Sequence, residues 1–256
     1  MRILVSEGTS RMGRSLLQRL SEEHRLRVAR PPGGETPEAP GIDVVDADLY
    51  DPEGARAAVS GVDAIVHTGP AGPPALPPGD SYEGERALLD RATRGTSVLL
   101  QAAVEARVSR LVHCSSLEVF HEVPDDIYVS DQHRPRPGTA MGRLGHHLAE
   151  QVTREFARDH ALGVTVLRLG RMVREDEVAA GSEPDLGWLD PRDAAAAVEL
   201  ALGRDNAGAR SWIGRWQVLH VCHLPPHPKF LLDGIRGMGF EPRHNFRRQW
   251  AARGAA

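Results

Sequence analysis

The chain has 256 residues, a formal net charge of -4 and a pI near 6.3. A net negative charge argues against a general nucleic-acid surface, which needs a clustered basic excess. The length suits one α/β domain with a small addition. Two cysteines, Cys114 and Cys222, cannot build a disulfide framework, and no leader-like or membrane-spanning apolar segment is recognisable. We therefore expect a cytoplasmic protein that contacts no membrane and whose partners are small molecules.

Short apolar runs alternate with longer amphipathic stretches, which is typical of βαβ units. The apolar runs predict core strands at residues 2–6, 26–30, 42–47, 63–68, 110–116 and 163–169. Apolar spacings of three and four residues predict helices at 13–24, 52–60, 85–106 and 141–160. This order predicts an α/β fold with a Rossmann-like, doubly wound parallel sheet. Ligands of such sheets bind at the carboxyl ends of the strands.

Two long loops follow predicted strands, at residues 69–84 and 120–138. Loops of this length beside strand ends usually cover a site, although mobile surface is the alternative. Further along, the pattern predicts a helix at 190–203, strands at 211–215 and 218–224, and a final helix at 228–239. The basic, small-residue-rich end predicts a frayed tail.

The segment SEGTSRMG, residues Ser6 to Gly13, joins the first strand to the first helix. This order of segments resembles the extended short-chain dehydrogenase/reductase family, whose members read roughly V-T-G-x-x-G-x-x-G here. Aligned on Gly13, Glu7 and Ser10 stand at the first and second glycines. The third glycine serves helix packing, and the second lets the backbone approach a pyrophosphate. Serine is a mild change there, whereas a Glu7 carboxylate repels a pyrophosphate, although Gly8 can supply the tight turn.

The resemblance also implies which residues hold the cofactor. Arg30 ends the second predicted strand, where NAD-preferring members carry an acidic residue. Arg11 lies in the turn that opens the first helix, so two guanidinium groups suit a ribose 2′-phosphate and favour NADPH over NADH. Two solvated surface arginines are the alternative. The expected cofactor-binding residues are Gly8, Ser10, Arg11, Met12, Arg30, Asp48, Leu49, Thr68 and Gly69.

Ketone reduction needs a hydride for carbon and a proton for the resulting oxyanion. The family takes this proton from a tyrosine assisted by a lysine one helical turn later, and a serine holds the oxygen. Ser116 matches the serine and is the expected catalytic residue. Met141 and Gly145 stand at the tyrosine and lysine positions, and neither can titrate. Lys229, the only lysine, is expected in a distant surface turn.

Several residues could replace the missing acid: Tyr128, His67, His113, His146 and His147. Free tyrosine titrates near pH 10, and Tyr128 has no lysine to lower that value. His146 follows Gly145 by one position, so we expect it to point about 100° away from the cofactor face. A different hypothesis is that a substrate hydroxyl beside the ketone stabilises the oxyanion, while the protein only orients the reactants.

Two further groups of residues are candidates for a functional role, the histidines and cysteine of segment 220–227 and the four tryptophans. The segment HVCHLPPH carries zinc-type ligands, but its spacing matches no common closed site, so we expect no metal centre at His220, Cys222, His223 and His227. The tryptophans lie in the part expected to cap the substrate, which favours an aromatic pocket over simple packing: Trp188, Trp212, Trp216 and Trp250.

Residues 1–170 are thus expected to form the dinucleotide-binding core, completed by the helix at 190–203, and 171–256 mainly a small substrate-binding region. The stripped active site is similar to that of the angucyclinone polyketide ketoreductases of the simocyclinone type, atypical members of this family. That resemblance implies an NADPH-dependent ketoreductase acting on a polycyclic aromatic ketone in antibiotic biosynthesis. A non-catalytic NADP-binding sensor or scaffold, and a non-redox cyclase or dehydratase, are the alternatives.

Overall fold

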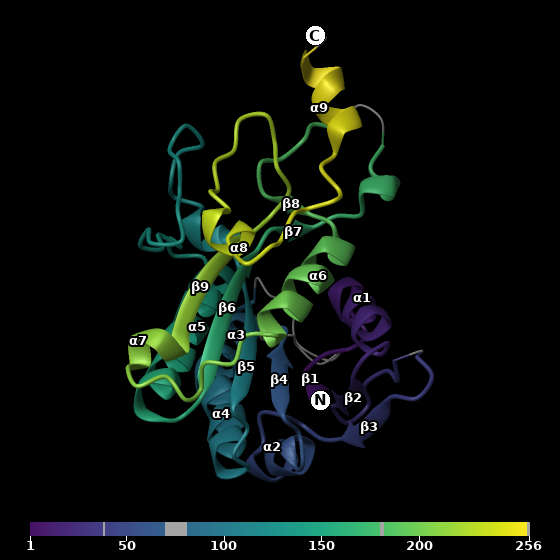
Figure 1. Cartoon of the computed structure of the whole chain (residues 1–256), viewed down its shortest axis with the longest axis vertical. Helices are drawn as coiled ribbons and strands as arrows, with labels where there is room; N and C mark the ends of the chain where they lie inside the picture. The colour runs from purple at the N-terminus through teal and green to yellow at the C-terminus, as the bar shows by residue number, and fades with distance from the viewer. Residues whose placement is uncertain (38, 70–80, 180–181, 255–256) are drawn as a thin grey trace.

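A parallel seven-stranded sheet forms the centre of the protein, in a computed structural model that describes residues 1–37, 39–69, 81–179 and 182–254 (Figure 1). Its order is β3-β2-β1-β4-β5-β6-β9. The strands are β1 (Arg2–Val5), β2 (Arg25–Arg30), β3 (Asp43–Asp46), β4 (Ala64–His67), β5 (Arg110–Ser116), β6 (Gly163–Leu169) and β9 (Trp216–Val221). The order reverses between β1 and β4, which is the switch point where such sheets bind ligands.

Helices cover both faces of the sheet. They are α1 (Arg11–Leu20), α2 (Pro52–Val59), α3 (Tyr82–Asp90), α4 (Thr96–Glu105), α5 (Met141–Asp159) and α6 (Pro191–Leu202). On one face, α1 and α6 pack together, and on the other α2, α4 and α5 lie side by side. A π-helical turn, η1 (Arg91–Gly95), joins α3 to α4, so the single helix predicted at 85–106 is interrupted.

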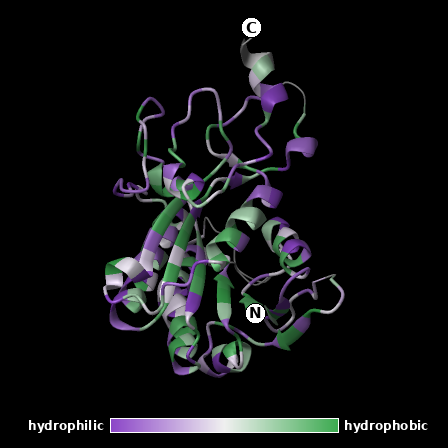
Figure 2. Cartoon of the chain, viewed as in Figure 1, coloured by the Kyte–Doolittle hydropathy of each residue, from purple (hydrophilic) through white to green (hydrophobic). Residues whose placement is uncertain are grey.

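The central strands β1, β4, β5 and β6 are apolar because helices bury them on both faces. Ile3 and Val5 point into the core beneath α1 and α6, while Leu4 between them faces α2 and α4. In Figure 2 much of the strands and of the helices packed on them is green, while purple hydrophilic residues are frequent in the loops around them. The predicted α/β fold with its doubly wound parallel sheet is confirmed.

Short elements gather beyond the carboxyl ends of β5, β6 and β9, toward the end of the molecule that holds the C-terminus (Figure 1). They are η2 (Leu117–Phe120), β7 (Arg171–Met172), η3 (Glu175–Glu177), β8 (Trp188–Leu189), α8 (Asp233–Arg236) and α9 (Arg247–Gly254). β7 and β8 form a separate two-stranded sheet.

Three predictions for the C-terminal part are wrong. Residues 211–215 were expected as a strand but include the helix α7 (Trp212–Arg215), which Ser211 caps by accepting a hydrogen bond from the Ile213 amide. The helix predicted at 228–239 is reduced to the four residues of α8. The described part of the expected frayed tail is instead packed at Phe246, which is fully buried against the rings of Trp188 and His223.

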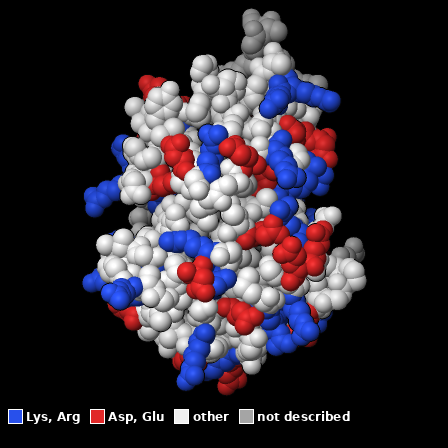
Figure 3. All heavy atoms as spheres, in the orientation of Figure 1, with Lys and Arg blue, Asp and Glu red and all other residues white. Residues whose placement is uncertain are grey.

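Of the loop predicted at 69–84, residues 70–80 lie outside the described part, and Tyr82–Gly84 begin α3. None of the described helices is long and apolar enough to span a membrane. On the face shown in Figure 3, acidic and basic side chains are interspersed rather than gathered into a basic stripe.

Candidate active site

A cavity of about 420 Å³ lies at the switch point of the sheet. The turn after β1, the end of β2 and the turn after β3 form its walls, and Gly69 after β4 closes one side. Its described lining is Ser6, Glu7, Gly8, Thr9, Ser10, Val28, Ala29, Pro31, Gly34, Glu35, Ala47, Asp48, Leu49, Tyr50, Gly69 and Arg91. We name it the cofactor cavity.

The turn after β1 is held tightly against helix α1. Ser10 caps the helix, accepting a hydrogen bond from the Gly13 amide at 3.0 Å. A Cβ atom on Gly13 would lie 2.6 Å from the Glu7 carbonyl oxygen, so only glycine allows the helix to approach the turn this closely. This confirms the packing role expected for Gly13.

The Glu7 side chain bends back into its own turn. One carboxylate oxygen, Oε1, accepts hydrogen bonds from the Thr9 amide at 2.5 Å, the Ser10 amide at 2.8 Å and the Thr9 hydroxyl at 2.7 Å. Backbone N–H groups at a helix start are natural anion donors. In this structure the turn therefore binds an anionic group, the carboxylate of its own Glu7.

The predicted cofactor residues divide into two sets. Gly8, Ser10, Asp48, Leu49 and Gly69 line the cofactor cavity. The other four are absent from its described lining: Arg11, Met12, Arg30 and Thr68.

Each of these four residues has another contact. Arg11 forms an ion pair with Glu177 at 2.9 Å, and Arg30 pairs with Asp46 and donates to the Thr36 hydroxyl, both at 2.5 Å. Met12 is buried in the core, and the Thr68 hydroxyl lies 3.0 Å from that of Ser6. The two arginines thus do not converge on the cavity in this structure.

Tyr50 and Arg91 are among the residues of the cofactor cavity that the sequence did not single out. The Arg91 guanidinium lies 5.0 Å from the centre of the Tyr50 ring, a cation–π contact. Burial raises the pKa of Tyr50 to about 12, so its hydroxyl stays protonated at neutral pH. Gly95 leaves room for the ring, because a Cβ there would overlap Tyr50. Neither residue belongs to a motif, so no pattern in the sequence pointed to them.

Three histidines lie together beside the cofactor cavity, and two of them, His67 and His113, are fully buried. His67 ends β4, His113 lies opposite it on β5 with ring centroids 5.2 Å apart, and His146 reaches over from α5. Burial lowers the pKa of His67 to about 4 and lowers those of His113 and His146 as well. All three rings are neutral at pH 7, which disfavours them as strong acids.

The orientation predicted for His146 is wrong. Its Cε1 atom would lie 3.7 Å from a Cβ on Gly69, a residue of the cofactor cavity. Gly145 instead faces α3, where a Cβ would lie 2.9 Å from Leu88. The helix is rotated relative to the expected register, so His146 rather than Gly145 points toward the Gly69 turn of the cofactor cavity.

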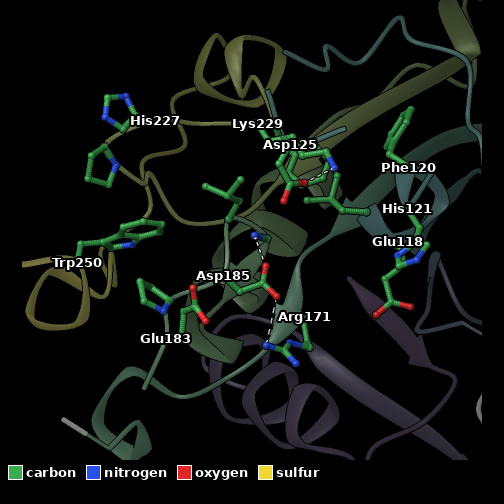
Figure 4. A pocket seen from close by; sticks show the side chains of 16 residues that line it. Glu118, Phe120, His121, Asp125, Arg171, Glu183, Asp185, His227, Lys229 and Trp250 are labelled. Atoms are coloured by element: carbon green, nitrogen blue, oxygen red, sulfur yellow. Dashed lines mark hydrogen bonds and ion pairs between the residues drawn. The ribbon is translucent and has the colours of Figure 1, made fainter. Parts of the chain in front are cut away.

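A second cavity, of about 1080 Å³, lies beyond the carboxyl ends of β5 and β6 (Figure 4). We name it the substrate cavity, after the role that we propose for it under "Proposed function". It combines aromatic and charged side chains from segments far apart in the sequence. Its lining is Leu117, Glu118, Phe120, His121, Asp125, Arg171, Glu183, Pro184, Asp185, Leu186, Gly187, Pro226, His227, Lys229, Phe230 and Trp250.

Lys229 is not in a surface turn, as its sequence position suggested. Its side chain is only 7% exposed and lines the substrate cavity. The Nζ atom donates to the Val123 carbonyl at 2.6 Å and to the Asp125 carboxylate at 2.7 Å. The Val129 amide also donates to the Lys229 carbonyl. Lys229 thus fastens the loop after β5 to the C-terminal segment.

Of the four tryptophans, only Trp250 is in the described lining of the substrate cavity. Trp188 is buried against Phe246, while Trp212 contacts Arg154 and Trp216 begins β9. Trp188 therefore packs in the core, whereas Trp250 lines the pocket.

The predicted catalytic Ser116 ends β5, next to both Leu117 and Glu118 of the substrate cavity. Its hydroxyl accepts a hydrogen bond from the Glu118 amide at 3.1 Å and so caps η2. His146 interacts electrostatically with Glu118 and touches the Gly69 turn. The first turns of α5 therefore lie next to both cavities.

No group of three or more histidine, cysteine or acidic residues that could hold a metal ion occurs within the described ranges. In the segment 220–227, His220 is buried beside Phe120 and Phe230, while His223 bonds the Trp188 carbonyl and Trp250.

The sheet order and the anion-binding turn define a dinucleotide-binding protein of the Rossmann class. A family model described as NAD(P)H-binding matches residues 8–198. The chain is 32% identical, over 250 aligned positions, to a dTDP-glucose 4,6-dehydratase from Streptomyces niveus, covering 80% of this chain and 71% of that protein. The chain belongs to the NAD(P)H-binding family, as an extended short-chain dehydrogenase/reductase of the NAD-dependent epimerase/dehydratase type.

Solved structures share the fold. A point mutant of uronate dehydrogenase from Agrobacterium tumefaciens, complexed with NAD, aligns with a TM-score of 0.75 and 21% identity, over 98% of this chain and 88% of that one. UDP-glucose 4-epimerase from Thermotoga maritima, solved with UDP-glucose, aligns with a TM-score of 0.72 and 15% identity, over the whole of both chains.

Proposed function

We propose that this protein is an NADPH-dependent ketoreductase that reduces a polycyclic aromatic ketone, as a tailoring step in the biosynthesis of an aromatic polyketide antibiotic. The observation that carries the proposal is the position of the two cavities. Both open at the carboxyl edge of one sheet, with the start of α5 beside each of them. A cofactor in one and a ketone in the other can therefore meet next to this helix.

When bound, NADPH supplies a hydride. One proton must also reach the oxygen, since each ketone and NADPH yield an alcohol and NADP⁺. The chain has three tyrosines, and none is placed to give this proton: Tyr50 lies in the cofactor cavity, while Tyr82 and Tyr128 are 79% and 64% exposed. Lys229 is bonded to Asp125.

We propose that the substrate itself stabilises the oxyanion and assists its protonation. A hydroxyl beside the ketone can hydrogen-bond the carbonyl and stabilise the developing oxyanion, and that hydroxyl or water then provides the proton. Ser116 is proposed to orient the carbonyl, and the aromatic walls of the substrate cavity, Phe120, Phe230 and Trp250, to hold the rings. Orientation alone can supply much of the rate acceleration.

The proposed preference for NADPH rests on arginine side chains near the part of the cofactor cavity where the adenosine would bind. Arg30 ends β2 and Arg11 opens α1, while Arg91 already lines the cofactor cavity. Binding of a 2′-phosphate by Arg30 and Arg11 requires each to leave its present carboxylate partner, Asp46 or Glu177. Exposed ion pairs of this kind are weak, so a phosphate can replace them.

The test is a fluorescence titration with NADPH and NADH, followed by turnover of two polycyclic ketones that differ only in the hydroxyl beside the carbonyl. We expect tighter binding of NADPH and reduction of the hydroxylated ketone alone. Equal turnover of both ketones would contradict assistance by the substrate. Binding of the dinucleotide without any turnover would favour the non-catalytic sensor or scaffold.

A second candidate is a dehydratase whose reaction involves no net oxidation or reduction, favoured by the 32% identity to the Streptomyces niveus dehydratase. Its test is incubation with dTDP-glucose, with loss of water followed by mass spectrometry. Formation of a dehydrated sugar nucleotide would replace the ketoreductase proposal.

A further inference from the structure

The turn after β1 holds an anion of its own. The Glu7 carboxylate accepts three hydrogen bonds, two of them from the backbone amides of Thr9 and Ser10. Among the described residues Glu7 has no basic ion-pair partner, so N–H and O–H donors alone hold its charge. These bonds are of the charge-assisted kind, which is stronger than bonds between neutral groups.

The donors used by Glu7 belong to residues that line the cofactor cavity, where an anion bound in the cavity could also reach them. Both amides belong to the lining of the cofactor cavity, directly before α1, where the helix dipole and free N–H groups attract an anion. The same N–H groups cannot serve a carboxylate and a diphosphate at once. The Glu7 carboxylate and a diphosphate bound at the same turn would also repel each other.

The backbone of the turn is fixed, so the side chain is the part that can move. Gly13 fits against the Glu7 carbonyl, and a Cβ on Gly8 would already lie 3.0 Å from Leu17. The Arg14 guanidinium donates to the Thr9 carbonyl on the same turn. Rotation of the Glu7 side chain therefore frees the amides without rebuilding the turn.

We propose that Glu7 is a built-in competitor for the cofactor diphosphate: its carboxylate occupies the amides of the turn in the free protein and leaves them when the dinucleotide binds. This inference rests on the assignment of the cavity to NAD(P)H. The competitor keeps the turn in its binding shape while lowering the affinity for any ligand that carries a diphosphate. A ligand that lacks phosphate is not affected.

The experiment compares ADP, adenosine and NADPH, each titrated calorimetrically into the wild type, Glu7→Gly and Glu7→Gln. If Glu7 occupies the amides about nine-tenths of the time, its removal tightens ADP and NADPH about tenfold. We expect this gain in Glu7→Gly and a smaller one in Glu7→Gln, because the neutral amide still accepts the same hydrogen bonds. The affinity for adenosine should not change.

The matched control is Glu35→Gln, which removes another carboxylate from the lining of the same cavity, one that accepts no hydrogen bond from the turn after β1. Its ratio of ADP to adenosine affinity should stay within about twofold of the wild type, since only long-range charge changes. An equal gain in Glu35→Gln would overturn the inference, because general repulsion would then explain the effect. Thermal unfolding of each variant checks that the turn remains folded.

The outcomes separate this inference from the proposed function. NADPH that binds with one affinity to the wild type and both Glu7 variants would overturn the competitor and leave the ketoreductase proposal standing. Failure of all three proteins to bind NADPH would overturn both.

Discussion

The two cavities differ in how their walls are built. Apart from Arg91 of η1, the cofactor cavity is lined by the end of β2 and by turns that follow β1, β2, β3 and β4 within a few residues. The substrate cavity instead joins segments near residues 117–125, 171, 183–187, 226–230 and 250. A site formed by local turns follows from a strand pattern, whereas a site formed by distant segments depends on tertiary packing.

Their polar groups differ as well. In the cofactor cavity the anion donors are backbone amides, fixed by the helix start and held in place by Gly13. In the substrate cavity the wall is held by side-chain contacts such as those of Lys229, and a buried ion pair lies beneath Phe120. Substitutions should therefore damage the two regions by different routes.

The largest effect is expected for Glu150→Gln, beneath the substrate cavity. Glu150 on α5 bonds Arg168 of β6 at 2.8 and 3.0 Å and accepts from the Ser115 hydroxyl at 2.6 Å, with all three buried. The change leaves the Arg168 charge buried without its partner, so the free energy of unfolding should fall by about 4 kcal/mol. Urea unfolding followed by circular dichroism measures this loss.

The control for Glu150→Gln lies on the same helix. Arg158 and Glu155 form an exposed pair at 3.1 Å, and Arg158→Gln should cost no more than about 0.5 kcal/mol. A similar cost for both variants would show that the buried pair has no special role in holding β6 to α5.

The next largest effect is expected for Gly13→Ala, beside the cofactor cavity. The added Cβ would lie 2.6 Å from the Glu7 carbonyl, so α1 must move away from the turn. We expect a loss of about 2 kcal/mol in unfolding free energy from overpacking, and NADPH binding weakened about 100-fold through the misplaced amides. Urea unfolding and fluorescence titration give the two values.

Gly142→Ala is the matched glycine substitution, because a Cβ there meets nothing within 4 Å. It should gain up to about 1 kcal/mol of stability, as alanine is a better helix former, and leave the affinity for NADPH unchanged. Retention of full cofactor binding in Gly13→Ala would mean that the turn does not need this close contact.

The two cavities differ in how far the sequence predicts them. Strands β1 to β6 and their order followed from apolar runs, and Gly8, Ser10, Asp48, Leu49 and Gly69 lie in the cofactor cavity because each follows a strand closely. The orientation of His146 failed, since one residue of helix register turns a side chain by about 100°. The surface position predicted for Lys229 failed because its partners, Val123 and Asp125, are more than 100 residues away in sequence.

Acidification should weaken both regions through buried histidines. Burial lowers the pKa of His67, beside the cofactor cavity, to about 4 and that of His220, beside Phe120, to about 3. The unfolded chain binds protons near pH 6.5, so stability from these neutral rings is present at higher pH and is lost as the pH falls below that value. Between pH 7 and 5.5 each ring should cost about 1 kcal/mol.

Protonation of Asp131 has the opposite effect on the free energy of unfolding. Burial raises its pKa to about 6, so its folded form keeps a proton that the unfolded form releases, and its contribution declines as the pH rises from about 4 to 6. Urea unfolding at pH 7 and 5.5 should still show a net loss on acidification, because the histidines outnumber this carboxyl. A protein more stable at pH 5.5 would contradict the neutral, buried rings.

The smallest effect concerns the edge of the substrate cavity, where Trp250→Ala should raise the KM for the ketone about tenfold by removing one aromatic wall. The indole Nε1 donates to His223 Nε2 at 3.1 Å, which fixes the ring at the cavity. The affinity for NADPH should not change, since Trp250 is absent from the described lining of the cofactor cavity. Trp212→Ala is the control, because its ring contacts Arg154 on α5 and lines neither cavity. An equal rise in KM for both variants would mean that tryptophan loss acts through general stability, and the C-terminal segment would then be packing rather than a wall for the substrate.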